Sequence, residues 1–353
     1  MMKILYAIQG TGNGHISRAR EIIPYLRNYG QIDILISGTQ CDVELGIPVK
    51  YRFKGLSFSF GKNGGIDLWN TTLNASLPNL RREIAQLNIE DYDLVINDFE
   101  PVSAWACRKK NVPCISLSHQ GSLLSDKVPI PKEKNHFGRF VLRNYAPASI
   151  HFGFHFNAYD EFIYTPVIRS QVREMEIDDL DYYTVYLPAY DDERLIQRLS
   201  SFGNIRWHIF SKHTRKPYYL ANISIKPITN DEFVKDMAGS TGVLCGAGFE
   251  TPAEALFLKK KLMVIPMKGQ YEQQCNAAAL ELMGVPVIKN LKDKHFDKID
   301  NWLTSDEKVE VNYPDQTQKI LSMIFGLNFN HMINTTIWDD GNQQHVRSLV
   351  FNK

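Results

Sequence analysis

The sequence predicts an α/β protein in which two similar domains face each other across a cleft. The chain has 353 residues, which is too long for one ordinary core and fits two domains. Its 44% hydrophobic and 22% charged residues are typical of a soluble globular enzyme. In each half an apolar strand runs into a glycine turn and then a helix, near residues 3–29 and 242–258. We therefore expect two Rossmann-like domains.

The first half is predicted to hold a parallel sheet covered by helices. Lys3–Gln9 is a short apolar strand, Ile16–Tyr29 has one apolar helical face, and Ile32–Ser37 closes the βαβ unit. Further strands are predicted at Tyr92–Asn97, Pro113–Leu117, Ser149–Phe156 and Glu161–Thr165, and helices at Leu68–Leu87, Val102–Lys110 and Pro129–Tyr145. The aromatic and glycine-rich residues 51–69 are predicted to form loops with one short strand.

The second half repeats the alternation after a crossing at residues 166–169. Strands are predicted at Asp181–Pro188, Ile205–Phe210, Ile223–Pro227, Gly242–Leu244, Leu262–Pro266 and Val285–Ile288. Helices are predicted at Glu193–Phe202, Asp231–Ala238, Gln273–Met283, Phe296–Thr304 and Gln316–Phe325, with a short one after the second glycine turn. We therefore expect an N-terminal domain over 1–166 and a C-terminal domain over 167–327, followed by an unassigned polar tail over 328–353.

Charge and cysteine content exclude several classes of protein. Forty basic and thirty-nine acidic residues leave a formal charge of +1, so no global field attracts nucleic acid. The five cysteines are scattered without a Cys-x-x-Cys pair, which favours a reducing compartment and argues against structural zinc. No apolar run reaches the roughly 20 residues that a membrane-spanning helix needs. We expect a cytoplasmic protein that does not bind nucleic acid.

The first glycine turn, Gly10-Thr11-Gly12-Asn13-Gly14-His15, admits three interpretations. A P-loop would end in Gly-Lys-Ser/Thr, whereas this turn ends in Gly-His-Ile. A dinucleotide-binding turn would have the spacing Gly-x-Gly-x-x-Gly, whereas these glycines are spaced by two. The third interpretation is a loop that brings a substrate to His15 at the start of a helix. We favour the third, because imidazole can accept a proton near neutral pH.

Two strands of the first half end in polar residues that should face the same crevice as His15. Asp98 follows one strand and could orient His15, as carboxylates orient histidine elsewhere. His119 and Gln120 follow the next strand and are candidates for the acceptor side. The alternatives are that His15 is only a polar residue at a helix start, that Asp98 caps a helix, and that His119 caps a loop.

In the second half, residues 245–280 have the composition of a cradle for phosphate and polyol. Gly246 and Gly248 let the backbone approach a ligand, and the following helix N-terminus suits phosphate. The polar segment 269–274 follows the next strand, at the edge where open α/β sheets bind ligands. An ordinary tight turn is the alternative. No cluster of His, Cys, Asp and Glu has metal-ligand spacing, so no metal is expected, and Arg169 and Lys212 are candidate cations for a leaving group.

These segments resemble those of GT-B glycosyltransferases, in the branch of the UDP-glycosyltransferases and the bacterial enzyme that adds N-acetylglucosamine to the lipid-linked cell-wall precursor. Residues 10–15 are similar to the motif Gly-Gly-Thr-Gly-Gly-His, and 246–254 to His-x-Gly-x-x-Ser-x-x-Glu. Pro266 followed by 272–277 is similar to Pro followed by Asp/Glu-Gln-x-x-Asn-Ala. The Asp-Phe-Glu-Pro at 98–101 is similar to a poorly characterised group of predicted bacterial and archaeal glycosyltransferases.

The resemblance implies inverting, metal-independent transfer from a nucleotide-diphosphate sugar, most simply a UDP-sugar, to a hydroxyl acceptor. His15 would be the base, with Asp98 as its partner. The donor contacts would come from Gly14, Arg169, Gly248, Phe249, Glu250, Thr251, Glu254, Glu272 and Gln273. The sugar nucleotide is a co-substrate, and no cofactor is implied. Two positions depart from the relatives, because Gly246 replaces a histidine and Pro188-Ala189-Tyr190-Asp191 replaces a Gly-Gly-Ser loop.

Two other functions remain as alternatives, together with several kinds of acceptor. A nucleotide-sugar 2-epimerase has the same fold, and a non-catalytic protein could bind a nucleotide sugar or glycan. The acceptor is lipid-linked, a glycan or a small molecule. Residues 129–145 mix basic with aromatic and aliphatic side chains. They form either a surface helix with a solvated basic face or a patch for peripheral contact with the inner face of the membrane.

Overall fold

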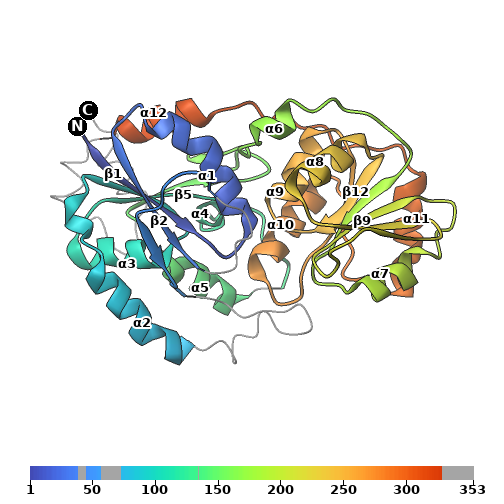
Figure 1. The fold of residues 1–353 in the computed structure, drawn as a ribbon, viewed down its shortest axis with the longest axis horizontal. Helices are drawn as coiled ribbons and strands as arrows, with labels where there is room; N and C mark the ends of the chain where they lie inside the picture. Colours follow the sequence, from blue (N-terminus) through green and yellow to red (C-terminus); the bar gives the residue numbers. More distant parts are fainter. Residues whose placement is uncertain (39–44, 57–72, 134, 328–353) are drawn as a thin grey trace.

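The computed structural model describes residues 1–38, 45–56, 73–133 and 135–327, which form two α/β halves side by side (Figure 1). The first half holds β1 (Lys3–Gln9), β2 (Gln31–Ser37), β3 (Tyr51–Phe53), β4 (Leu94–Asp98), β5 (Cys114–Ser118), β6 (Ile150–Phe154) and β7 (Ile163–Tyr164). The second holds β8 (Tyr183–Tyr186), β9 (Trp207–Ser211), β10 (Tyr218–Leu220), β11 (Ile223–Pro227), β12 (Gly242–Gly246) and β13 (Lys261–Ile265). These two sheets confirm the predicted fold class.

Both sheets are doubly wound. The strand orders are β3-β2-β1-β4-β5-β6-β7 and β10-β11-β9-β8-β12-β13, and every pairing is parallel except that of β10 with β11. Each order reverses beside its first strand, between β1 and β4 in one sheet and between β8 and β12 in the other. Ligands of open α/β sheets bind outside the carboxyl ends of the strands at such a switch point. Asp98 and Gly246 end the strands at these two points.

Helices cover the sheets, as parallel sheets require. The first half contains α1 (Asn13–Leu26), α2 (Leu73–Gln86), α3 (Pro101–Lys110), α4 (His119–Ser122) and α5 (His136–Tyr145). Next come α6 (Ser170–Arg173), α7 (Asp192–Leu199), α8 (Asn230–Gly239), α9 (Glu250–Phe257), α10 (Tyr271–Leu282), α11 (Phe296–Thr304) and α12 (Thr317–Phe325). Six of the seven residues of β1 are buried, so this strand lies at the centre of the first core.

Several elements differ from the sequence predictions. The helix predicted over Pro129–Tyr145 begins only at His136, where the side chain of Asn135 caps it by accepting from Gly138 N at 2.8 Å. The strand predicted at Val285–Ile288 is a single bridge between Val264 and Val287. The exposed edge strand β10 was not predicted, because its three residues are too few for a periodic pattern. The predictions for 57–72 and 328–353 lie outside the described residues.

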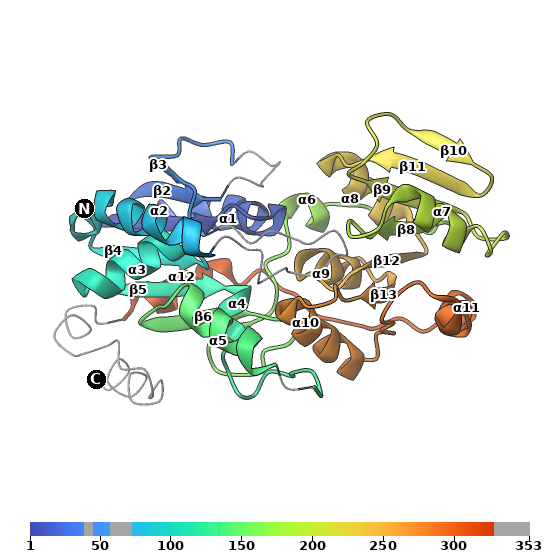
Figure 2. The same cartoon turned by 90° about the horizontal axis from the view of Figure 1, so that it is seen from below.

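The chain crosses between the halves twice. The first crossing runs through α6, which lies between the halves in Figure 2. The second returns the chain to the first half, where α12 packs beside α1 and the ring of Phe325 stacks on Tyr29 with centroids 4.0 Å apart. The helix α12 therefore packs on the first half, although it lies within the residues predicted for the second domain. The domain bounds remain a prediction.

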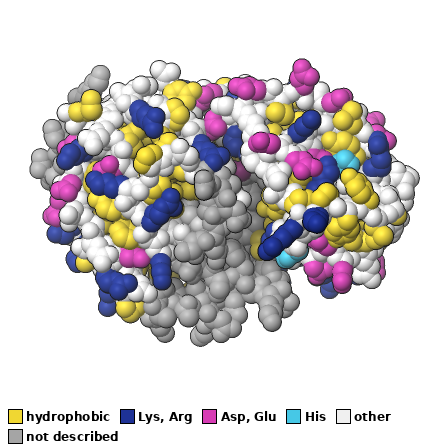
Figure 3. Space-filling view, in the orientation of Figure 1, with side chains coloured by type: hydrophobic (Ala, Val, Ile, Leu, Met, Phe, Trp, Pro, Cys, Tyr) yellow, Lys and Arg dark blue, Asp and Glu magenta, His cyan; other side chains and the backbone are white. Residues whose placement is uncertain are grey.

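The described surface mixes charges of both signs. On the face shown in Figure 3, basic and acidic side chains are interspersed among hydrophobic ones. This distribution accompanies the formal net charge of +1. No described helix is long and apolar enough to span a bilayer.

Candidate active site

A cavity of about 280 Å³ lies between the two halves and is lined by residues from both. The first half contributes the glycine loop before α1, Phe99 after β4, the start of α4, and α5. The second half contributes the segments that lead into α9 and α10. These are the carboxyl ends of strands in both sheets, so the switch points of the two halves open into one cavity.

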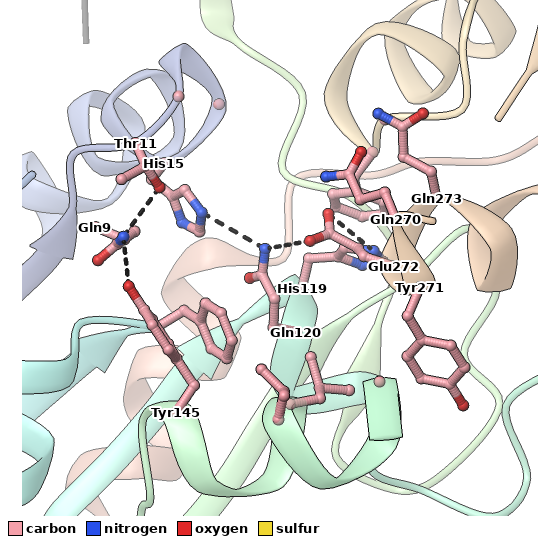
Figure 4. Close-up of a pocket in the computed structure, with 18 of the residues that line it drawn as sticks. Gln9, Thr11, His15, His119, Gln120, Tyr145, Gln270, Tyr271, Glu272 and Gln273 are labelled. Atoms are coloured by element: carbon pink, nitrogen blue, oxygen red, sulfur yellow. Dashed lines mark hydrogen bonds and ion pairs between the residues drawn. The ribbon is translucent and has the colours of Figure 1, made fainter. Parts of the chain in front are cut away.

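His15 lines this cavity, and one of its two ring nitrogens is hydrogen-bonded to a buried carboxylate. Its Nδ1 lies 2.8 Å from Asp98 Oδ1, and its Nε2 lies 3.5 Å from Gln120 Nε2. Figure 4 shows the ring facing Gln120. The Asp98 carboxylate at Nδ1 favours the neutral tautomer that carries its proton there and leaves Nε2 free to accept one, and Arg18 Nη2 also lies 3.1 Å from Nδ1. The structure thus brings His15 and Asp98 together as a hydrogen-bonded pair.

The Asp98 carboxylate is completely buried and is balanced by Arg18. Arg18 donates from Nη2 to Asp98 Oδ1 at 2.7 Å and from Nε to Oδ2 at 3.1 Å. Burial acts to raise the pKa of Asp98, but the charges and hydrogen bonds of Arg18 and His15 outweigh it and hold that pKa below its ordinary value. Asp98 is therefore ionised at neutral pH and can stabilise a proton taken up by His15.

Asp98 does not cap a helix, because Glu100 caps the helix that follows, α3. Glu100 is the cap of α3 and accepts from Val102 N and Ser103 N, both at 2.7 Å. Between the two acids, Phe99 has a φ of 55°, in the left-handed region that is uncommon for a bulky residue. This turn directs the two side chains to different helices. Asp98 forms hydrogen bonds with side chains of α1, and Glu100 with the backbone of α3.

The first glycine loop closely approaches the start of α9. Arg18 donates from Nη1 to Glu250 Oε1 at 2.6 Å, across the boundary between the halves. A Cβ on Gly14 would lie only 2.4 Å from Glu250 Oε2, so a larger residue here would displace the end of the Glu250 side chain. Burial disfavours the charged guanidinium, but the carboxylates of Asp98 and Glu250 outweigh it and raise the pKa of Arg18. Arg18 therefore connects the His15 pair to the second half.

Three helices begin beside the cavity without a side-chain cap. They are α1, α9 and α10, none of which has a side-chain hydrogen bond from its cap residue in the described part of the chain. The N-terminus of a helix presents backbone N–H groups and the positive end of the helix dipole. Gly248, Phe249 and Glu250 line the cavity at the start of α9. This arrangement can bind an anion such as a diphosphate.

Glu272 and Gln273 line the opposite wall at the start of α10. Glu272 Oε2 accepts from Gln120 Nε2 at 3.1 Å, and Gln273 Oε1 accepts from Met267 N at 2.8 Å. The first contact joins the halves across the cavity, and the second fixes the turn before α10. Both residues line the cavity, where their polar side chains can form hydrogen bonds with a ligand.

Three predicted donor residues lie outside the lining of the cavity. Arg169 and Glu254 form a bidentate ion pair, with distances of 2.5 and 2.6 Å. Burial raises the pKa of Glu254, although Arg169 opposes this shift. Thr251 lies in the first turn of α9 and also does not line the cavity. These three residues are therefore not among those that line the cavity with His15.

His119 joins the two halves. Its Nδ1 lies 2.8 Å from Phe154 O, its Nε2 lies 2.8 Å from Asn276 Oδ1, and its ring stacks on Phe249 at 3.9 Å. Burial lowers the pKa of His119, which is 1% exposed. The loop-capping role considered for it belongs to Ser118, whose Oγ accepts from Gly121 N at 3.0 Å.

Several residues of this site and its surroundings were not among those predicted from the sequence. Arg18 is three residues after His15 and shares its helix face, so helical spacing could have found it. Gln9 and Tyr145 meet by a 2.9 Å hydrogen bond across 136 positions, and no local pattern marks such a contact. Gln270, which precedes α10, also lines the cavity.

The residues at the two departures from the relatives do not line the cavity. Asp191 caps α7 by accepting from Arg194 N at 2.7 Å. The carboxylate of the next residue, Asp192, accepts hydrogen bonds from Ser211 and Tyr218. Both carboxylates therefore already have hydrogen-bond partners within the protein. A Cβ on Gly246 would have its nearest neighbour at 3.8 Å, so this position is open. Within the described part of the chain, no group of three or more His, Cys, Asp or Glu side chains could hold a metal ion.

Two Rossmann-like halves with a shared cavity at their switch points are the architecture of the GT-B fold. The chain belongs to glycosyl transferase family 1, whose family model matches residues 2–305. It is accordingly a glycosyltransferase, as the sequence motifs predicted. No curated protein sequence matches the chain.

Solved structures share the fold at low sequence identity. The glycotransferase of kitacinnamycin is 10% identical, with a TM-score of 0.59 over 99% of each chain. The Staphylococcus aureus MnaA–UDP structure is 12% identical, with a TM-score of 0.60 over 92% of this chain and 96% of the other. The glycosyltransferase SsfS6 of Streptomyces sp. SF2575 with thymidine diphosphate is 12% identical, with a TM-score of 0.53 over 92% and 100%.

Proposed function

We propose that the chain transfers a sugar from a nucleotide-diphosphate sugar, most simply a UDP-sugar, to a hydroxyl acceptor with inversion at the anomeric carbon. One observation carries the proposal. His15, backed by the ionised Asp98, faces the cavity opposite the uncapped start of α9. A proton acceptor and an anion site on two sides of one cavity are what displacement of a nucleoside diphosphate by a hydroxyl requires.

In the proposed reaction, His15 Nε2 takes the proton of the acceptor hydroxyl as its oxygen attacks the anomeric carbon. The bond from that carbon to the diphosphate oxygen breaks, and its electron pair leaves with the nucleoside diphosphate. The N–H groups at the start of α9 receive the developing negative charge. Asp98 stabilises the imidazolium, because its own pKa is held low. Attack from the face opposite the leaving group inverts the configuration.

The remaining donor contacts follow from the arrangement of the second half. The backbone of Gly248–Glu250, with Gly14 opposite, is assigned to the diphosphate. Glu272 and Gln273 are assigned to hydroxyls of the transferred sugar. Thr251, Glu254 and Arg169 are assigned to the nucleoside side. Two of the similar structures contain UDP and thymidine diphosphate, which supports a nucleoside diphosphate as the ligand of this half.

Binding of the nucleotide is the first test. We expect one of UDP, TDP, GDP or CDP to raise the unfolding temperature, because a ligand present at 100 times its Kd stabilises the native state by about 2.7 kcal/mol. The matching nucleoside without phosphate should give a smaller shift, since it lacks the charge that α9 receives. A shift with NADH and with none of the diphosphates would contradict the proposal.

Turnover then separates the alternative functions. With the nucleotide sugar that binds, we expect release of the nucleoside diphosphate at the same rate in EDTA and in Mg²⁺, since the proposed charge stabilisation comes from helix N–H groups. Conversion of the donor into its 2-epimer without an acceptor would identify an epimerase. Binding without any consumption of the donor would identify a non-catalytic binding protein.

We also propose that the outer face of α5 touches an anionic membrane. Phe137 and Phe140 are 52% and 63% exposed on this helix, and Ile130 just before it is 43% exposed. The same helix lines the cavity with Val141 and Leu142. Residues 126–145 contain five basic and two acidic residues. Exposed aromatic side chains with a positive balance suit the surface of anionic lipid.

Vesicle sedimentation tests this surface. We expect the protein to bind vesicles that contain an anionic lipid at low salt, and to bind neutral vesicles less. The variant Phe137→Ser/Phe140→Ser should bind about tenfold more weakly, because two apolar side chains no longer enter the interface. The variant Tyr219→Ser/Leu220→Ser, which removes exposed apolar groups from β10, is the matched control. Equal binding by both variants, or none by the native protein, would refute the contact.

A further inference from the structure

Two side chains compete for Nδ1 of His15, and they favour opposite tautomers of the ring. Asp98 Oδ1, at 2.8 Å, is an acceptor and favours a proton on Nδ1. Arg18 Nη2, at 3.1 Å, can only donate and favours a bare Nδ1, which places the ring proton on Nε2. Only the first tautomer leaves Nε2 able to take a proton from an acceptor hydroxyl. The direction in which Arg18 donates therefore decides whether His15 can act as a base.

In the structure, the guanidinium of Arg18 is turned toward Asp98. Its Nη2 donates to Asp98 Oδ1 at 2.7 Å and to Oδ2 at 2.9 Å, and its Nε donates to Oδ2 at 3.1 Å. These two nitrogens form one edge of a rigid plane, so the position of the remaining nitrogen, Nη1, fixes the direction of that edge. Whatever holds Nη1 therefore also determines whether Nη2 donates to the carboxylate or to the imidazole.

Glu250 of the second half holds Nη1. Its Oε1 accepts from Arg18 Nη1 at 2.6 Å, in a short hydrogen bond between two charged groups. The side chain of Arg18 is only 4% exposed, whereas that of Glu250 is 33% exposed and lines the cavity. Glu250 is the first residue of α9, while Asp98 and His15 both belong to the first half. A side chain of one half thus orients a buried guanidinium of the other.

The carboxyl group of Glu250 also lies against the loop that carries His15. A Cβ on Gly14, the residue before His15, would lie 2.4 Å from Glu250 Oε2 and 2.8 Å from Oε1. The absence of a side chain at Gly14 therefore leaves the space that this carboxyl group occupies beside Arg18. Two independent contacts, one with the guanidinium and one with the loop, connect Glu250 to the surroundings of His15.

We propose that Glu250 is a positioning residue for His15, which sets the tautomer of the base by holding Arg18 toward Asp98. This inference rests on the proposed function, in which His15 Nε2 takes the proton of the acceptor. Because Glu250 belongs to the half that holds the proposed donor site, separation of the halves removes its carboxylate from Arg18. The base is therefore complete only when the donor half lies against the first half.

The proposal gives the Glu250 side chain a role different from that of the backbone at the start of α9, which is assigned to the diphosphate. A carboxylate repels a diphosphate, so Glu250→Gln removes a negative charge beside the proposed anion site. We therefore expect this variant to bind the nucleoside diphosphate at least as tightly as the native protein. A slower reaction with retained binding separates positioning from a structural defect, which would weaken both.

Single-turnover consumption of the donor measures the chemical step. We expect its rate in Glu250→Gln to fall about tenfold, as the loss of one hydrogen bond between charged groups implies. The matched control is Glu21→Gln, which removes a carboxylate of α1 that accepts from Ser170 N at 3.1 Å and does not line the cavity. It should keep the native rate. A native rate in Glu250→Gln would overturn the assignment while leaving the transferase function in place.

A double substitution tests whether Glu250 acts through His15. Because His15→Gln already removes the base, adding Glu250→Gln should cause no further loss of rate. A further loss of about tenfold in the double variant would show that Glu250 contributes independently of His15, and the proposal would then be wrong.

The tautomer itself can be observed by NMR without turnover. In protein that contains isotope-labelled histidine, the ring nitrogen signals show which nitrogen carries the proton, and His15→Gln identifies the signals of His15. At a pH where the ring is neutral, we expect a proton on Nδ1 in the native protein and a mixture of both tautomers in Glu250→Gln. The same tautomer in both proteins would overturn the proposal. If no nucleotide sugar is consumed, the proposed function fails, and this measurement still decides the role of Glu250.

Discussion

Replacing His15 by glutamine is expected to reduce kcat by about 10²- to 10⁴-fold, the range that a positioned general base contributes. Glutamine keeps a polar side chain that can still reach Asp98, but it cannot take a proton from the acceptor. Binding of the nucleoside diphosphate, measured by the shift in unfolding temperature, should persist, because α9 is unchanged. Single-turnover measurement of donor consumption is the readout that isolates the chemical step.

The control for His15→Gln is His213→Gln, an exposed histidine after β9 that does not line the cavity. It should retain native activity. Asp98→Asn should also lose activity, because the amide can no longer stabilise the imidazolium by its charge. If His15→Gln retained native kcat, the base would have to be sought elsewhere, although the fold and family would stand.

Replacing Arg18 by methionine is expected to lower the free energy of unfolding by about 3–5 kcal/mol, the cost of leaving a buried charge without its partner. Methionine fills a similar length, so packing changes little. The reason for the large effect is that Asp98 is completely buried and Arg18 supplies its permanent positive neighbour. Urea unfolding of the native protein and the variant at pH 7 measures the difference.

The destabilisation caused by Arg18→Met should shrink as the pH falls. In the native protein the pKa of Asp98 is lowered, so its contribution to stability is present above the unfolded value of about 3.9 and is lost below it. Without Arg18, the effect of burial, which raises the pKa of Asp98, is opposed less, so acidification protonates the carboxylate more readily and relieves the unpaired charge. The difference in unfolding free energy should therefore be smaller at pH 4 than at pH 7.

A double substitution provides the control for this charge argument. Arg18→Met combined with Asp98→Asn should be less destabilised than the sum of the two single variants, because residues in one ion pair are coupled. It should also lose the pH dependence. Strict additivity, or a destabilisation by Arg18→Met that is independent of pH, would show that Arg18 acts through packing and not through its charge.

The features that the sequence predicts well are local ones. Alternating apolar segments and glycine turns predict most strands and place His15, Asp98 and Glu272 at strand or helix ends. Parallel strands then bring these ends to one edge, so the meeting of His15 with Asp98 follows from topology. The motif similarity to glycosyltransferases gives the same fold and is consistent with the family match.

The features that escape prediction depend on contacts between distant segments. Arg18 meets Glu250 across 232 positions, and the orientation of Gln9 depends on Tyr145 and on the carbonyl of Leu56. Within the Asp-Phe-Glu-Pro segment, either acid could cap α3 by spacing alone. The positive φ of Phe99 decides between them, and such a backbone conformation is not encoded by a pattern that can be recognised in one sequence.

The return of the chain through α12 has a mechanical consequence. Gln316 donates to Thr165 at 2.9 Å, so the two crossings between the halves lie next to each other. Ser170 also donates to Glu21 at 2.6 Å, which anchors the first crossing to α1. A pair of adjacent tethers permits bending about the line across them but resists shear and twist. We therefore expect the cavity to open by a hinge rotation of the halves about the two crossings, with the facing walls kept in register.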